Sequence, residues 1–449
     1  MSLLKKKILS DADRKQSIRE RVDNAPFRPN EDEAEQVRLI SEKIANEFRD
    51  EISTGGFTED IKERIIHSIT RMTEGLDLDY ETQRRIELVA ISNITGLGPI
   101  EPYIEDETVT EIIVQRYDNI CVERAGLIET VDTAFLSEAH LRNVIGRIVQ
   151  PVGRQINLYT PMVDARLSDG SRVNATIPPV TPDGSTLTIR KFPERSLTGE
   201  DYIRLRSLSR AMLVFLKAGV EGKLNIIVSG GTTSGKTTLL NMLSMFIPAG
   251  DLVITIEDSC ELRLMQPNVR RMESRMVNAE GMMPITIQSL VRNALRMRPD
   301  RLIVGEIRDG TVVDMMSAMS TGHPGSLSTV HANSPQNLVN ARLPILYSMN
   351  NTATFSEDAQ RMQIVEAIQL IVHVDRCKKT GKRKITSITH VVGLDDERRI
   401  VLKDIFRFNE KRDDFEFTGY VPVPLIEQIR SAGVDFDENI FQRKEGEPL

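Results

Sequence analysis

The sequence lacks any apolar run long enough to cross a membrane. Its apolar stretches stay below the roughly 18 residues that a membrane-spanning helix needs, and its first residues contain no signal-peptide hydrophobic region. We therefore expect a cytoplasmic protein.

Cysteine is scarce, with three among 449 residues, and Cys121, Cys260 and Cys377 lie far apart in the chain. No C-x-x-C pair and no Cys/His spacing suited to zinc occurs. The sequence therefore excludes a disulfide framework and shows no zinc motif, and it fits a reducing compartment.

Positive charge is not in excess either. The chain has 58 lysines and arginines against 65 acidic residues, a formal net charge of −7. A protein that binds nucleic acid through bulk electrostatics carries a positive field, so we expect no nucleic-acid partner. The length exceeds what one hydrophobic core supports and predicts two or three domains.

What the sequence does contain is a phosphate-binding loop of the pattern G-x-x-x-x-G-K-[ST], at residues 230–237. The β-branched run 224–229 precedes it and the start of an amphipathic helix follows it, which is the strand-turn-helix setting that such a loop needs. Lys236 would reach the outer phosphates and Thr237 would offer a hydroxyl to Mg²⁺. We expect ATP and Mg²⁺ as cofactors, held by Gly230, Gly231, Thr232, Thr233, Ser234, Gly235, Lys236, Thr237 and Thr238.

Two later strands are predicted to end in acidic residues. The apolar run 252–256 leads into Glu257 and Asp258, and the run 302–304 leads through a glycine into Glu306. In a nucleotide-binding α/β domain the carboxyl ends of the strands converge on the ligand crevice, where carboxylates are costly unless they serve a metal or a water. Structural salt bridging is the alternative interpretation.

A polar, glycine-containing stretch at 321–334 holds His323 and His331, two of only six histidines. A lone histidine is usually structural, but a pair that follows the second acid-tipped strand predicts a role in the same site. Beyond it, the strands expected from residue 366 onward are predicted to form a C-terminal cap without chemistry.

Four further segments surround this site in the sequence. Residues 1–30 are expected to form a flexible tail, with a membrane-docking arm as the alternative, and apolar residues at three- and four-residue steps predict a helical bundle over 31–95. Strand patterns around a helix predict a smaller α/β (α+β) domain over 96–192. A linker over 193–205 would join it to a nucleotide-binding α/β domain over 206–449.

Taken together, these motifs resemble the type II/type IV secretion ATPases, and within them the CpaF group of Tad (tight adherence) pilus ATPases. The resemblance runs from about Gly96 to Phe408. It rests on four ordered boxes, namely the phosphate loop, an Asp box at 256–261, an atypical Walker B at 296–308 and a His box at 323–333. Residues 161–166 and 187–192 resemble the N-terminal signatures of the group.

The resemblance implies a RecA-like P-loop ATPase domain preceded by the smaller domain, assembled as a homo-hexamer with sites between domains and subunits. Glu306 would orient and activate the attacking water. Glu257 and Asp258 would support metal and water, and His331, together with His323, would sense the γ-phosphate.

Three arginines of the smaller domain are candidates to complete this site. The alternating stretch 161–177, with an Asp-Gly turn, predicts a hairpin that carries Arg166 and Arg172, and the following strand carries Arg190. They could lie on the solvent face of a sheet. Because phosphoryl-transfer sites often take a cation from outside the core, we nominate Arg172 and Arg190, with Arg166 third.

The implied function is an ATP-hydrolysing motor that drives assembly or retraction of a Tad or type IV-like pilus, or secretion across the membrane. It would work at the cytoplasmic face of the inner membrane with polytopic pilus platform proteins, and indirectly with a pilin system. The alternative is a nucleotide-regulated scaffold or switch with little turnover.

Overall fold

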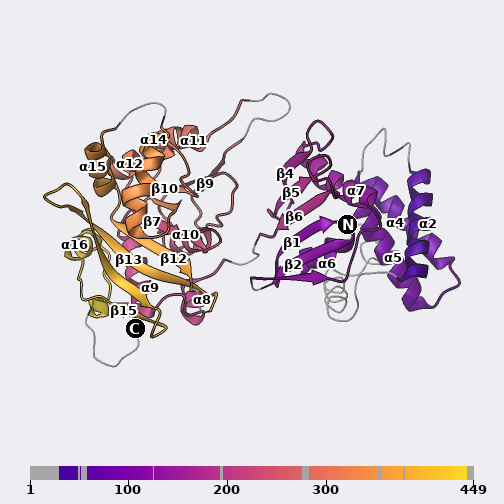
Figure 1. Ribbon diagram of the computed structural model, residues 1–449, viewed down its shortest axis with the longest axis horizontal. Coiled ribbons are helices and arrows are strands. Elements are labelled where there is room, and N and C mark those ends of the chain that lie inside the picture. The colour runs from indigo at the N-terminus through magenta and orange to yellow at the C-terminus, as the bar shows by residue number, and fades with distance from the viewer. Residues whose placement is uncertain are drawn as a thin grey trace. The chain divides into compact units, whose positions relative to one another are not determined.

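The computed structural model describes residues 30–48, 51, 58–124, 126–192, 196–275, 283–350, 355–377 and 380–441. The chain divides into two compact units, residues 1–194 and residues 195–449 (Figure 1). The expected tail lies outside the described residues, apart from Asn30. Within the described ranges no helix has the length and apolarity to cross a membrane.

Helices open the N-terminal unit and lie side by side in Figure 1, namely α2 (Glu31–Glu47), α4 (Glu59–Glu74) and α5 (Tyr80–Thr95). Each helix is capped at its N-terminus by a side chain that accepts a hydrogen bond from a backbone N–H of the first turn. The capping residues are Asn30, Thr58 and Asp79. Their apolar faces share one core that includes Val37, Ile44, Ile65, Ile69 and Ile86. The helices lie where the periodic pattern predicts them.

An antiparallel sheet follows these helices in the N-terminal unit, with the strand order β3-β2-β1-β6-β5-β4 among the described residues. Its strands are β1 (Val109–Arg116), β2 (Asn119–Arg124), β3 (Leu127–Val131), β4 (Met162–Arg166), β5 (Arg172–Thr176) and β6 (Thr186–Arg190). Helix α7 (Glu138–Val149) covers one face, and short helical turns occupy Gly98–Ile100, Glu101–Glu105 (α6) and Gln150–Val152. Strand β3 was not predicted, because this edge strand is almost wholly exposed and has no apolar alternation.

His140 joins the helical bundle to the sheet domain. Its Nδ1 accepts the Leu136 N–H at 3.2 Å, so its Nε2 carries the proton and donates to the Asn93 carbonyl at 3.3 Å, at the end of α5. Arg147 donates to the carbonyls of Asn93 and Ile94 at 2.8 and 2.9 Å. Burial, aided by the charge of Arg147, lowers the pKa of His140 to about 4.

This contact predicts that acid destabilises the junction between α5 and α7. A histidine whose pKa lies near 4 when folded and near 6.5 when unfolded contributes stability above pH 6.5 that is lost as the pH falls towards 4. We expect the free energy of unfolding to fall by about 1 kcal/mol per pH unit between pH 6.5 and pH 4. Hydrogen exchange of peptides from α5 and α7 in the full chain, corrected for intrinsic rates, measures it.

The variant His140→Gln keeps one donor and one acceptor but does not titrate, so it should abolish the acid sensitivity of these peptides. His67→Gln, an exposed histidine of α4, is the matched control and should leave it intact. An unchanged acid response in His140→Gln would exclude His140 as its source.

The C-terminal unit is built on one mixed sheet. Among the described residues the strand order is β15-β14-β13-β12-β7-β11-β10-β8-β9, and the strands from β12 to β9 run parallel. The strands are β7 (Ile226–Gly230), β8 (Val253–Glu257), β9 (Val269–Glu273), β10 (Arg301–Val304), β11 (Leu327–His331), β12 (Leu370–Arg376), β13 (Arg383–Leu394), β14 (Ile400–Asn409) and β15 (Asp414–Phe417).

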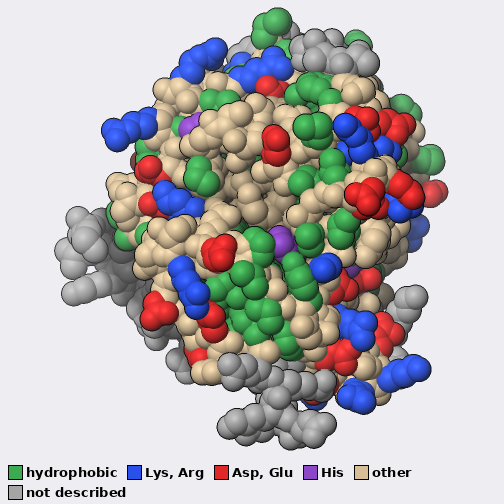
Figure 2. All heavy atoms as spheres, turned by 90° about the vertical axis from the view of Figure 1, so that its left-hand side faces the viewer, with side chains coloured by type: hydrophobic (Ala, Val, Ile, Leu, Met, Phe, Trp, Pro, Cys, Tyr) green, Lys and Arg blue, Asp and Glu red, His purple; other side chains and the backbone are tan. Residues whose placement is uncertain are grey.

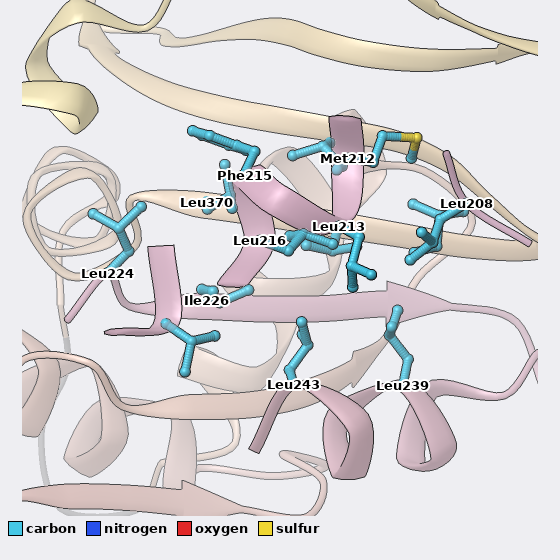
Figure 3. Packing of buried hydrophobic residues seen from close by; sticks show 14 of the residues in the cluster. Leu208, Met212, Leu213, Phe215, Leu216, Leu224, Ile226, Leu239, Leu243 and Leu370 are labelled. Carbon is cyan, nitrogen blue, oxygen red and sulfur yellow. The ribbon is translucent and has the colours of Figure 1, made fainter. Parts of the chain in front are cut away.

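Helices cover both faces of this sheet. They are α8 (Gly199–Arg204), α9 (Arg210–Glu221), α10 (Lys236–Ser244), α11 (Ile287–Ala294), α12 (Thr311–Ser320), α13 (Pro335–Asn337), a π-helical turn (Leu338–Arg342), α14 (Leu343–Ser348), α15 (Glu357–Ala367) and α16 (Val423–Ser431), with 3₁₀ turns at Leu295–Met297 and Glu438–Phe441. On one face Leu213 and Leu216 of α9 and Leu239 of α10 pack with Ile226 and Leu370 of the sheet (Figure 3). Helices α11, α12, α14 and α15 pack on the other face. The predicted α/β fold class is confirmed.

The surface of this unit fits the composition of the chain. Figure 2 shows acidic and basic side chains interspersed over one face, with hydrophobic side chains gathered in a patch among them. Exposed apolar residues of the unit include Val392, Val421 and Val423. Side chains of mixed charge keep most of this surface hydrated, whereas the patch of hydrophobic side chains is poorly hydrated.

Three expectations about this unit are corrected by the structure. Residues 199–204, assigned to a linker, form α8, because Thr198 and Asp201 make a capping box that starts a helix. The C-terminal strands are not a cap, since β12 pairs directly with β7 and continues the central sheet. The predicted strand at 366 starts only at Leu370, because α15 extends to Ala367.

Candidate active site

The phosphate loop connects β7 to α10 at the carboxyl edge of the parallel strands. A Cβ added to Gly230 would come within 2.2 Å of the carbonyl oxygen of Val374 on β12, so no side chain fits there. Gly235 has a φ of +98°, and Thr233 also lies in the left-handed region with a φ of +56°. The backbone therefore requires glycine at 230 and favours it strongly at 235.

Lys236 and Ser234 line the inside of this loop. The Lys236 ammonium donates to the Gly231 carbonyl at 2.9 Å. Burial lowers the pKa of Lys236, and the nearby negative charge of Glu306 opposes that effect. The Ser234 hydroxyl is buried and has no hydrogen-bond partner within the described part of the chain. A buried hydroxyl without a partner, in a loop that presents backbone N–H groups, is what a binding site for phosphate oxygens would contain.

The other residues predicted to bind nucleotide lie beside these two. Gly231 and Thr232 follow the end of β7 in the turn, whereas Thr237 and Thr238 lie in the first turn of α10. The helix N-terminus carries a partial positive charge, which favours an anion at this point.

Acidic residues and a histidine reach the same edge from neighbouring strands. Glu257 ends β8, Glu306 follows β10 by two residues, and His331 ends β11. The register places His331 directly opposite Gly230, and Gly305 donates its N–H to the Ile256 carbonyl at 2.8 Å. The parallel sheet therefore brings these three predicted site residues to the edge where the phosphate loop begins.

Glu257 is held by the backbone that follows it. Its Oε2 accepts the N–H groups of Glu261 and Leu262 at 2.7 and 2.9 Å, whereas its Oε1 is buried without a partner among the described atoms. The side chain is 3% exposed, and this burial raises the pKa of Glu257 although the two N–H donors oppose the change. A fixed carboxylate with one open oxygen fits a residue that accepts a hydrogen bond from a water in the site.

Arg308 links the two acidic segments and was not among the predicted site residues. It donates to Glu306 Oε2 at 2.6 Å and lies 3.3 Å from Asp258 Oδ2. The hydrogen bond to Glu306 raises the pKa of Arg308. Asp258 also accepts the Ser274 hydroxyl at 3.0 Å. The signal in the sequence is an arginine two residues after the acid of the Walker B box.

His323 does not lie at this edge of the unit. It precedes β11, and its Nδ1 is 3.1 Å from the carbonyl of Pro299, which precedes β10. Because β10 and β11 run parallel to β7, their amino ends lie at the edge of the sheet opposite the phosphate loop. The grouping of His323 with His331 is therefore wrong within one chain, since the buried strand β11 separates them.

The polar stretch that holds both histidines contains a central strand, which the sequence analysis did not predict. Residues 327–331 form β11 between β7 and β10. Its hydroxyl groups are satisfied inside the sheet, because Ser328 donates to the Val304 carbonyl and Thr329 to the Gly305 carbonyl, each at 2.8 Å. Such bonds allow a serine- and threonine-containing strand to be buried.

The three nominated arginines form a row in the N-terminal unit. Arg166 lies opposite Arg172, and Arg172 lies opposite Arg190, across β4, β5 and β6. Glu111 of β1 is the cross-strand neighbour of Arg190 on the other side. The row is not part of the site that the C-terminal unit forms by itself.

The described residues contain no group of three or more histidine, cysteine or acidic side chains arranged to hold a metal ion. A site of this kind would hold Mg²⁺ through the phosphates of a nucleotide and few protein ligands, which is how Mg²⁺ is usually bound in phosphoryl-transfer sites. Thr237 remains the predicted protein ligand.

Comparison with known proteins gives a family for this arrangement. The profile of the family "Type II/IV secretion system protein" matches residues 93–414. A putative conjugal transfer protein of Mycobacterium tuberculosis is 31% identical over 303 residues, which cover 66% of this chain and 85% of that protein. The type IV secretion system protein VirB11 of Bartonella henselae is 30% identical over 337 residues, which cover 67% of this chain and 93% of that protein.

A solved structure is also similar. The VirB11 ATPase of the Brucella suis type IV secretion system, crystallised in complex with sulphate, is 28% identical and covers 65% of this chain and 94% of its own, with a TM-score of 0.36.

Proposed function

Since the chain belongs to the family of type II/IV secretion system proteins and is an ATPase, we propose that it acts as a hexameric motor. Hydrolysis of ATP would drive assembly or retraction of a Tad or type IV-like pilus, or secretion across the membrane. The observation that carries the proposal is the meeting of the phosphate loop with Glu257, Glu306 and His331 at one sheet edge.

The residues divide the work of phosphoryl transfer between them. Lys236 would bind the outer phosphates, and Thr237 would hold Mg²⁺. Bound Mg²⁺ supplies charge neutralisation on the phosphates. Glu306, oriented by Arg308, positions a water and accepts its proton.

Two further residues support this water. Glu257, through its open Oε1, and Asp258, beside Arg308, would support this water and the metal without binding the metal directly. His331, opposite Gly230, senses whether the terminal phosphate is present.

The arginine row would supply a further cation from outside the C-terminal unit. The three arginines lie in register across β4, β5 and β6, and a cation brought to a developing phosphate charge can raise a rate about 10³- to 10⁵-fold. In a hexamer the row would come from the same chain or from a neighbour, so that closure of the N-terminal unit completes the site.

The partners follow from the proposed role. A motor for pilus assembly works at the cytoplasmic face of the inner membrane, against polytopic platform proteins, and reaches the pilin only through them. Pilin and polytopic membrane-protein genes beside the gene for this chain would support the Tad assignment, whereas genes for conjugation would favour substrate secretion.

Steady-state phosphate release tests the motor against the alternative scaffold. With Mg²⁺ and excess ATP, we expect the full-length protein to release many phosphates per subunit, because a motor must turn over repeatedly. Native mass spectrometry with an ATP analogue should show six copies. Release that stops near one phosphate per subunit would favour the scaffold, and a strictly monomeric species would exclude sites shared between subunits.

A further inference from the structure

Arg383 reaches the phosphate loop from a hairpin that the sequence analysis left without chemistry. It is the first residue of β13, which pairs antiparallel with β12, and β12 lies beside β7 with Val374 opposite Gly230. The hairpin thus places Arg383 at the sheet edge where the loop begins. Its cross-strand neighbour on β12 is a second arginine, Arg376.

One side chain contacts both left-handed residues of the loop. The Arg383 Nε donates to the Thr233 carbonyl at 3.2 Å. Its Cδ lies 3.1 Å from the point where a Cβ of Gly235 would stand. Thr233, with a φ of +56°, is a β-branched residue in a conformation that costs energy and persists only when the surroundings hold it. The hydrogen bond from Arg383 to the Thr233 carbonyl helps to keep Thr233 in this conformation.

The backbone around Arg383 is fixed to the start of the C-terminal unit. The Arg383 carbonyl accepts the Ser207 hydroxyl at 2.8 Å, and the Ile385 N–H donates to the Ser207 carbonyl at 2.8 Å. Lys384, 2% exposed, donates to the Arg206 carbonyl at 2.7 Å. These bonds join β13 to the turn between α8 and α9, so Arg383 acts from a rigid base rather than from a free loop.

Arg383 and Arg376 lie opposite each other on neighbouring strands, and this pairing of like charges is electrostatically unfavourable. Two like charges directly opposite each other on neighbouring strands destabilise a sheet. Arg383, the member of the pair that contacts the loop, would be attracted to an anion bound there, which would offset that cost.

We propose that Arg383 is a positioning residue of the phosphate loop. It holds Thr233 and Gly235 in the shape that binds phosphate, and it ties that shape to the connection between α8 and α9. The inference rests on the proposed function only in that the loop binds nucleotide. It assigns a role in nucleotide affinity and none in the chemical step.

The test is the affinity of a fluorescent ADP for full-length Arg383→Ala, with KM and kcat for ATP measured alongside. We expect affinity to fall about fivefold and KM to rise by the same factor, the effect of losing one hydrogen bond, with kcat unchanged. The thermal midpoint of the nucleotide-free protein should fall by only about 2 to 4 °C, because one hydrogen bond is lost. Arg383→Lys, which keeps a donor and the charge, should recover most of the affinity.

Lys382→Ala is the matched control, because it removes one positive charge from the adjacent, exposed position. Equal affinities for Arg383→Ala and Lys382→Ala would overturn the proposal. If Arg383→Ala does not fold, Arg383→Gln takes its place as the test, because glutamine keeps an N–H donor. A nucleotide affinity within twofold of wild type would support the proposal, and a larger loss of affinity would overturn it. A wild-type protein that bound no nucleotide would instead refute the proposed function.

Discussion

Replacing Glu306 by glutamine is expected to lower kcat about 10²- to 10⁴-fold while ATP affinity stays within a few-fold of wild type. Glutamine keeps the size of the side chain and can still contact Arg308, which retains Asp258 as its ion-pair partner at 3.3 Å. What is lost is the carboxylate that, in the proposed mechanism, orients the water and takes its proton. Phosphate release at saturating ATP and nucleotide binding at equilibrium measure the two effects separately.

Glu357→Gln is the matched control for that variant. Glu357 lies on α15 and also pairs with an arginine, Arg361, at 2.8 Å, but on the surface. It should turn over at the wild-type rate. If Glu306→Gln did so as well, Glu306 could not be the base, and Glu257 with its open Oε1 would become the candidate.

Replacing Lys236 by alanine should abolish useful nucleotide binding. The ammonium of Lys236 is half-buried, and it bonds the Gly231 carbonyl at the mouth of the loop, from which it can turn to a phosphate. Removing one partner of a buried charge pair costs about 2 to 5 kcal/mol, which corresponds to affinity about 30-fold to several thousand-fold weaker. Calorimetric titration with ADP and Mg²⁺ measures the loss.

Lys217→Ala removes the same charge from the exposed face of α9, where Lys217 pairs loosely with Glu221 at 3.8 Å. Its nucleotide affinity should equal that of wild type. The fold of Lys236→Ala should also be intact, since α10 keeps Leu239, Leu240 and Leu243 in the core. Wild-type affinity in Lys236→Ala would remove the phosphate loop from the proposed mechanism.

Local patterns carried much of the prediction. Residues 224–243 follow the strand, loop and helix order that the spacing of glycine, lysine and threonine requires, and β8 and β10 end at or just before the acids that the sequence places there. These features succeed because each depends on neighbours in the chain. The helices of residues 31–95 were predicted for the same reason.

Other features depend on partners far away in the sequence. The strand β11 contains polar residues, and only its place between β7 and β10 satisfies them. His323 and His331 are eight residues apart but lie at opposite edges of the sheet, because the strand β11 runs from one edge to the other between them. Neither periodicity nor spacing could separate them.

The sequence by itself predicted a phosphate loop, the residues that would hold the phosphates and the acids that follow two of the strands. The loop and its flanking elements are contiguous, so local conformational preferences encode them. The tertiary structure decided which of the remaining residues meet that loop. It brought Arg308 and Arg383 to that loop and, within one chain, placed His323 at the opposite edge of the sheet. Strand order and direction, set by packing of the whole sheet, determine which ends of the strands lie together.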